Sequence, residues 1–182
     1  MSKFITATKV VTGKVRMNYV NVFTARTIEG SSDERYSICI LIPKNDRETL
    51  KKINDSITKA IAISDLDFSD GDFKLPLRDG DLDKNSNLEF KNHYFINATS
   101  KFKPGIVDLN LNEITDPNEV YSGCYGRVSI SFYDFNAKGH KGIGCCLLNI
   151  QKLCDGERLG FKNNAAEDFS GEFKEEGFDI LN

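Results

Sequence analysis

The chain has 182 residues, of which 40% are hydrophobic and 28% are charged, and its formal net charge is −3. This balance excludes a disordered or fibrous protein and predicts one globular domain that is large enough to bury a core. No apolar run approaches the ~20 residues that a membrane-spanning helix needs, and the N-terminus lacks the apolar segment of a signal peptide. We therefore expect a cytoplasmic protein that does not associate with membranes.

The negative charge is concentrated at the C-terminal end. Residues 167–182 contain six acidic residues and one basic residue, and removing them leaves 21 acidic and 23 basic residues. Charge asymmetry of this kind often separates a binding domain from an interaction tail. We predict a domain at 1–166 and an acidic, aromatic tail at 167–182. The alternative is a tail that only improves solubility, with its rings packed on the domain.

The N-terminal part of the chain predicts three strands. Residues 4–28 are rich in valine and predict two strands with a kink or turn between them. Residues 35–43 predict the third strand, in which alternate residues from Tyr36 to Ile42 share one face. Pro43 ends this strand because proline cannot donate a hydrogen bond to a neighbouring strand.

A single helix is expected over about residues 45–64. Asn45 or Asp46 can cap its N-terminus, and Glu48 adds a negative charge to the first turn, where the helix dipole favours it. Apolar residues at helical spacing indicate that one side of the helix packs on the core. These residues are Leu50, Ile53, Ile57, Ala60 and Ile61.

The regular pattern stops between residues 65 and 89, and so long a loop in a compact domain is usually functional or disordered. An EF-hand calcium loop is excluded because Lys84 stands where glycine is needed and Phe90 where glutamate is needed. Clustered carboxylates can hold magnesium for phosphoryl transfer, which makes a metal-dependent nuclease the alternative function. Its carboxylates would be Asp70, Asp72, Asp79, Asp81 and Asp83. Catalytic carboxylates are better held on rigid elements than on a polar loop, so we expect no enzyme and no bound metal.

The C-terminal half of the domain predicts a strand at 93–103, a short extension at 106–108 and a hairpin at 120–153. In the hairpin, Val128 and Ile130 represent the core face. The opposite face carries Arg127, Ser129, Ser131, Tyr133 and Phe135. Rings for stacking and cations for phosphates are typical of surfaces that bind single-stranded nucleic acid. The alternative is an ordinary amphipathic hairpin with a few surface rings.

Taken together, the predicted elements are five or six strands, one helix after the third strand, and long loops. This pattern favours a mainly β, OB-fold-like five-stranded barrel with one capping helix at about 45–64. An α+β roll without barrel closure is the alternative. The five cysteines have no zinc-binding spacing, so we expect buried free thiols and no cofactor.

Four segments follow one another along the chain: LPLRDGD at 75–81, NATSKFKPGIVD at 97–108, SGCYGRVSISFYDF at 122–135 and GIGCCLLNIQKLCDGERLG at 142–160. In this order they resemble the phage single-stranded DNA-binding proteins, a family similar to the replication protein of the phage T7 type. The resemblance covers roughly residues 5–160, and the tail matches in character. Phe161 departs from the family, which often has a second glycine there, and Phe178 is set back from the last residue.

The resemblance implies an OB-fold that coats single-stranded DNA in phage replication and recombination, inside the host cell cytoplasm. It also implies that the acidic tail competes with DNA for a basic groove and recruits replication proteins such as a polymerase or helicase. The family often forms homodimers. We expect a sequence-tolerant binder without catalytic activity.

The candidate binding residues combine rings with cations. The stacking candidates are Tyr125, Tyr133 and Phe135. The cations expected to contact phosphates are Arg127, Lys138 and Lys141 from the hairpin, with Lys14, Arg16, Arg78, Lys101 and Lys103 from other segments. The tail residues expected to bind partners are Phe169, Glu172, Phe173, Glu175, Glu176, Phe178 and Asp179.

Overall fold

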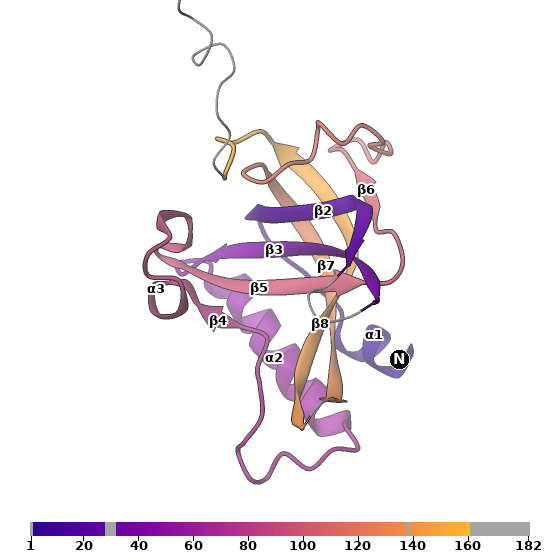
Figure 1. The fold of residues 1–182 in the computed structure, drawn as a ribbon, viewed down its shortest axis with the longest axis vertical. Helices are drawn as coiled ribbons and strands as arrows, with labels where there is room; N and C mark the ends of the chain where they lie inside the picture. The colour runs from indigo at the N-terminus through magenta and orange to yellow at the C-terminus, as the bar shows by residue number, and fades with distance from the viewer. Residues whose placement is uncertain (1, 28–31, 138, 161–182) are drawn as a thin grey trace, which may run out of the picture.

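The described part of the chain consists of strands with a few helical segments (Figure 1). The computed structural model describes residues 2–27, 32–137 and 139–160. The helical segments are α1 (Ser2–Thr8), α2 (Arg47–Ile63), α3 (Gly80–Asp83) and the 3-10 helix η1 (Leu88–Phe90). The strands are β1 (Val10–Val11), β2 (Val15–Thr27), β3 (Glu34–Pro43), β4 (Arg78–Asp79), β5 (His93–Ser100), β6 (Gly105–Val107), β7 (Tyr125–Ala137) and β8 (His140–Cys154).

Five of these strands close a barrel. They neighbour one another in the order β7–β2–β3–β5–β8, and β8 pairs with β7 to complete the ring. The pairs are antiparallel except for β5 and β8, which meet as parallel neighbours at Thr99 and Cys146. The expected OB-fold-like barrel of five strands is therefore confirmed. Figure 1 shows β2, β3 and β5 side by side, with the β7–β8 hairpin crossing behind them.

The main core fills this barrel because side chains alternate between the two faces of each strand. Ile38, Ile40 and Ile42 of β3 point into it, as do Val128 and Ile130 of β7. The predicted core face of the hairpin is thus confirmed. Three of the five cysteines are also buried, while Cys146 is half-buried and Cys154 is exposed.

Helix α2 packs against the barrel much as the sequence predicts. The Asp46 side chain accepts a hydrogen bond from the Thr49 backbone N–H at 3.0 Å, which caps the first turn. Ile53, Ile57 and Ala60 are buried on the side that faces the core. None of the helices in the described ranges is both long and apolar enough to cross a membrane.

The first residues of the chain were wrongly predicted as strand. Residues 4–8 belong to α1, in which Phe4 and Thr8 lie one turn apart and are both buried. The Thr8 hydroxyl accepts a hydrogen bond from the Phe132 N–H at 2.8 Å and donates to its carbonyl at 2.9 Å or to that of Phe4 at 2.7 Å. Contacts with β7 thus override the β propensity of the segment.

The expected structureless stretch between residues 65 and 89 contains three short elements, β4, α3 and η1. They form a lobe over residues 78–92, in which β4 pairs with β5 and Phe90 of η1 is buried. The prediction of one helix was therefore incomplete, because α1, α3 and η1 are too short to show helical periodicity.

Candidate nucleic-acid interface

One row of side chains crosses the outward face of the barrel. Tyr125 of β7 pairs with Arg16 of β2, Arg16 pairs with Leu41 of β3, Leu41 pairs with Phe95 of β5, and Phe95 pairs with Arg78 of β4. Residues directly opposite each other point to the same side of a sheet. Leu41 and Phe95 belong to a cluster separate from the main core, so the whole row faces outward. We call these five residues the ring–cation row.

Each end of the ring–cation row pairs a ring with positive charge. The Lys14 Nζ lies 4.8 Å from the centroid of the Tyr125 ring, and the Arg16 Cζ lies 5.6 Å from it. At the other end, the Arg78 Cζ lies 5.1 Å from the centroid of Phe95. These distances are within the range of cation–π attraction, which fixes the cations beside the rings.

The middle of the row is apolar. Cys39, Leu41, Phe90 and Phe95 form a small buried cluster, and the Phe90 and Phe95 rings meet edge to face with centroids 5.1 Å apart. Burial raises the pKa of the Cys39 thiol to about 12, so the thiol stays neutral. Leu159 packs against the cluster from outside. These four side chains are at most 1% exposed, so the middle of the row is covered and only its ends are accessible.

Polar side chains lie beside the ring–cation row on the same face. Two residues before Leu41 on β3, Cys39 pairs with Asn18 of β2 and with Asn97 of β5. Two residues before Cys39, Ser37 pairs with Asn21 of β2 and with Thr99 of β5. Amides and hydroxyls can hydrogen-bond sugars or the edges of bases. The face therefore combines rings, cations and neutral hydrogen-bonding groups.

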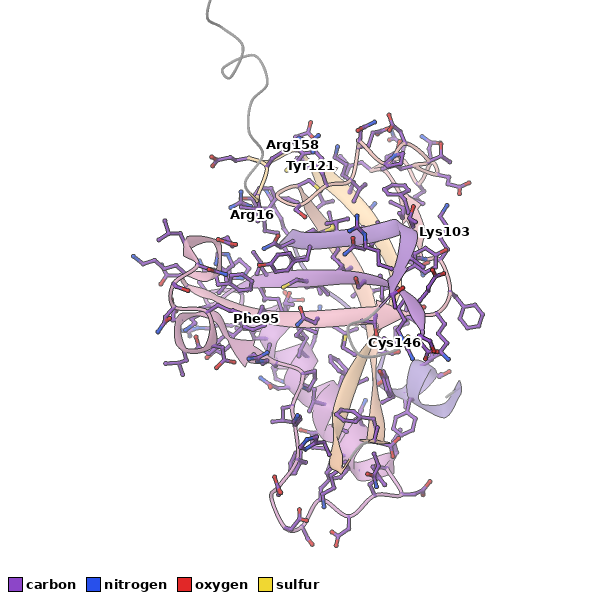
Figure 2. All side chains as sticks on the ribbon, viewed as in Figure 1. Arg16, Phe95, Lys103, Tyr121, Cys146 and Arg158 are labelled. Atoms are coloured by element: carbon purple, nitrogen blue, oxygen red, sulfur yellow. The ribbon has the colours of Figure 1, made fainter. Side chains whose placement is uncertain are left out.

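Residues 155–159, which follow β8, lie across one end of this face, and we call them the strap. The Arg158 Cζ lies 4.0 Å from the centroid of Tyr121, the Gly156 N–H donates to the Tyr121 hydroxyl at 3.2 Å, and Arg16 donates to the Glu157 carbonyl at 2.8 Å. A side chain on Gly156 would collide with the carbonyl oxygen of Gly123. Figure 2 shows Arg16, Tyr121 and Arg158 close together at the same end of the strands as Phe95.

Lys44 anchors the lobe at residues 78–92 beside the other end of the row. Its Nζ lies 2.7 Å from an oxygen of Asp79 and 2.7 Å from an oxygen of Asp81. The hydrogen bond from Lys44 lowers the pKa of each carboxyl, and the same two bonds raise the pKa of Lys44. Asp83 pairs with Arg78 at 2.8 Å. These carboxylates therefore hold the lobe in place through ion pairs.

The predicted binding residues fall in separate places. Lys14, Arg16, Arg78 and Tyr125 come together on the ring–cation row and its ends. Arg127 lies apart from them, because its Nε donates to the Thr12 carbonyl at 3.2 Å and its side chain lines a groove beside α2 with Lys9 and Lys52.

The predicted residues on the outer face of the hairpin are more buried than residues on an open stacking surface would be. Ser129 and Ser131 are buried, and Tyr133 is half-buried, packed against the main core, where burial raises the pKa of its phenol. Phe135 is half-buried. Lys141 pairs with Asp70 at 2.6 Å and so ties the preceding loop to the hairpin.

The remaining predicted cations lie after β5 or outside the described residues. Lys101 and Lys103 are exposed, and Lys101 lies 3.6 Å from Asp33. Figure 2 shows Lys103 at the opposite end of the strands from Arg16. Lys138 and the whole tail at 167–182 lie outside the described residues.

Sequence reasoning missed Phe95, Tyr121 and Arg158. Phe95 stands in the predicted strand 93–103 on the same face as Asn97 and Thr99, so alternation alone could have suggested it. Tyr121 and Arg158 lack such a signal, because they meet only when the chain returns after β8.

Comparisons with known proteins agree on one family. The family described as the ssDNA-binding protein of Enterobacter phage Enc34 matches residues 8–179. The single-stranded DNA-binding protein of phage Enc34, solved in complex with ssDNA, superposes with a TM-score of 0.74 at 25% identity, covering 84% of this chain and 90% of that one. Protein p50 of Acyrthosiphon pisum secondary endosymbiont phage 1 is 24% identical over 82% of this chain and 85% of its own length.

A more distant structure shares the fold. The single-stranded DNA-binding protein encoded by bacteriophage T7 has a TM-score of 0.59 at 13% identity, covering 93% of this chain and 97% of that one. The match to the Enc34 family spans residues 8–179 and so covers nearly the whole chain. This chain therefore belongs to the family of the Enterobacter phage Enc34 ssDNA-binding protein, a phage single-stranded DNA-binding protein family with an OB-like fold.

Proposed function

We propose that this protein binds single-stranded DNA, without sequence preference and without catalysing a reaction, across the outward face of β2, β3 and β5. The observation that carries the proposal is the ring–cation row, which places Arg16 and Lys14 at Tyr125 and places Arg78 at Phe95. A strand of DNA that crosses this face would meet the charge of Lys14 and Arg16 at one end of the row, while at the other end Asp83 pairs with Arg78 at 2.8 Å and offsets its charge.

Affinity in this arrangement comes from two additive sources. Each base that stacks on an aromatic ring contributes about 1–3 kcal/mol, and this term is nearly independent of sequence because every base has a π-face. Each phosphate that meets a cation releases counterions, which makes binding weaker as salt rises. Of the two rings in the row, Tyr125 is half-buried and can stack a base, whereas Phe95 is only 1% exposed and serves to position Arg78.

The ion pairs of the carboxylates support a binding protein over a nuclease. Asp79 and Asp81 are held by Lys44, Asp83 by Arg78, and Asp70 by Lys141. Within the described ranges, no three His, Cys, Asp or Glu side chains converge as a metal site. The carboxylates instead anchor the lobe and the hairpin loop, which keeps the outward face in one shape.

Three finer features complete the proposal. The protein acts in replication and recombination in the cytoplasm of the host cell. The tail at 167–182 competes with DNA for the outward face and recruits replication proteins such as a polymerase or helicase. Two copies form a homodimer. The support for the tail's role is its composition, since six acids and three phenylalanines resemble the charge and rings of a nucleic acid.

Fluorescence anisotropy with labelled oligothymidine tests the central proposal. We expect much tighter binding to the single strand than to a duplex of the same length. The logarithm of affinity should fall with the logarithm of salt by about 0.7 for each phosphate contact. Equal affinity for duplex, or no response to salt, would contradict it. The same strands incubated with Mg²⁺ or Mn²⁺ should stay intact; their cleavage, lost in Asp79→Ala, would favour the nuclease.

A further inference from the structure

Strand β2 contains a distortion on the outward face, at Tyr19. The pairing of β2 with β3 is interrupted between Asn18 and Asn21. Tyr19 has a φ of 46°, in the left-handed region that a bulky side chain rarely adopts. The Asn18 Oδ1 accepts a hydrogen bond from the Tyr19 N–H at 2.8 Å, and the Asn21 Nδ2 donates to the Tyr19 carbonyl at 3.2 Å. The two asparagines thus hold Tyr19 in this conformation from both sides.

The distortion carries two costs at neighbouring residues. A non-glycine residue in the left-handed region is strained, and glycine would adopt the same φ without strain. Asn18 is only 2% exposed, and its amide nitrogen has no hydrogen-bond partner within the part of the chain that the structure describes. Strain and unsatisfied buried polar groups tend to persist where function requires them.

The geometry turns the Tyr19 side chain outward. Tyr19 is 53% exposed and does not belong to the main core, although it lies in the middle of a barrel strand. Its ring centroid lies 6.3 Å from that of Phe90, at an interplanar angle of 34°. Phe90 is fully buried in the lobe and so gives the exposed ring a rigid neighbour. One side of Tyr19 is thereby supported and much of the ring stays accessible.

We propose that Tyr19 is a base-stacking residue of this protein, held in its strained conformation by Asn18 and Asn21 so that one nucleobase of single-stranded DNA packs on its ring. The inference rests on the proposed function and adds a subsite to it. Asn18 pairs with Cys39 on the outward face, next to the ring–cation row, so a base on Tyr19 belongs to the same bound strand. Arg16 stands two residues before Asn18 on the same face and can meet the adjoining phosphate.

Two substitutions separate a binding role from a structural one. Tyr19→Gly removes the ring and relieves the left-handed strain, so the melting temperature should be unchanged or higher. Its affinity for oligothymidine should fall roughly five- to hundredfold, which is the loss of one stacked base. Tyr19→Phe restores the ring and should recover most of the affinity that Tyr19→Gly loses. Weaker binding by Tyr19→Gly together with a lower melting temperature would assign the residue a structural role and overturn the inference.

A tryptophan reporter observes the stack directly, because the chain contains no tryptophan. The emission of Tyr19→Trp should be quenched as oligothymidine is added. The matched control is Leu109→Trp, at a residue that is 63% exposed in the turn after β6; its emission should change little. If the unmodified protein binds the single strand while Tyr19→Trp is quenched no more than the control, the inference is wrong and the proposed function stands. If the unmodified protein does not bind, the proposed function fails first.

Discussion

Arg16 combines two roles at the scale of a single residue. Its guanidinium lies over the Tyr125 ring and donates hydrogen bonds to the carbonyls of Gly123 and Glu157 at 3.3 and 2.8 Å. Carbonyl oxygens fix the orientation of a guanidinium without cancelling its charge. The positive charge therefore remains available to a phosphate while its position is set by the strap.

Replacing Arg16 tests whether its charge contacts a phosphate of the bound DNA. Arg16→Ala should weaken binding to oligothymidine and lower the salt slope by about 0.7, the value for one phosphate contact on a single strand. The control is Lys59→Ala, which removes the same charge from an exposed position on α2. Titrations at several salt concentrations supply both slopes. An equal change in the two variants would mean that Arg16 acts only through net charge.

Individual candidate residues could be named from the sequence more readily than the residues that they contact. Lys14, Arg16 and Tyr125 were each predicted, but Arg16 and Tyr125 meet because β2 pairs with β7, which alternation within either strand cannot indicate. The conformation of Tyr19 could not be predicted, since nothing in its local sequence indicates a left-handed φ in the middle of a strand. The partial burial of Tyr133 likewise depends on its packing against the main core, which brings together residues from other elements.

At the scale of elements, long periodic segments were predictable and short ones were not. Helix α2 and the β7–β8 hairpin are long enough to show their periods of 3.6 and 2, and both were predicted. The lobe at residues 78–92 shows no period, because its fold depends on the ion pairs of Lys44 and on Phe90 packing against Phe95. Tertiary contacts of this kind decide the structure of α1 as well.

The ion pairs of the lobe predict a dependence on acid. Lys44 lowers the pKa of Asp79 and Asp81 below the ordinary value of 3.8, so the folded protein binds their protons less readily than the unfolded chain. Their contribution to stability is therefore complete above that value and is lost as the pH falls through the lowered pKa. Lys44→Met should flatten the decline of melting temperature between about pH 5 and pH 2.

The control for this experiment is Lys51→Met, which breaks an ion pair with Asp55 on the exposed side of α2. Exposed pairs of this type contribute little to stability. Melting curves of both variants across the acid range give the comparison. A Lys44→Met protein that declines as steeply as the unmodified protein would show that the lobe is not held by these pairs.

At the scale of the whole molecule, the distribution of charge along the chain can be compared with the place where the described chain ends. The residues before the tail carry a small positive balance, while residues 167–182 carry six acids against one base. The last described residues form the strap, which lies across Tyr121 and Arg16, and Leu159 packs on the outward cluster. The described part of the chain therefore ends beside the proposed DNA-binding face, seven residues before position 167, so we expect the tail to have a high effective concentration there.

Removing the tail tests whether it competes with DNA. Deletion of 167–182 should strengthen binding to oligothymidine, and the gain should be largest at ~10 mM salt, where the Debye length is ~30 Å, and should shrink as salt screens the tail's charge. A tail of the same length with its six acids changed to amides separates charge from length and should bind DNA as tightly as the deletion. Unchanged affinity in both variants at low salt would rule out competition, while leaving DNA binding by the barrel intact. The deletion should also abolish binding to a replication polymerase or helicase, measured by co-sedimentation.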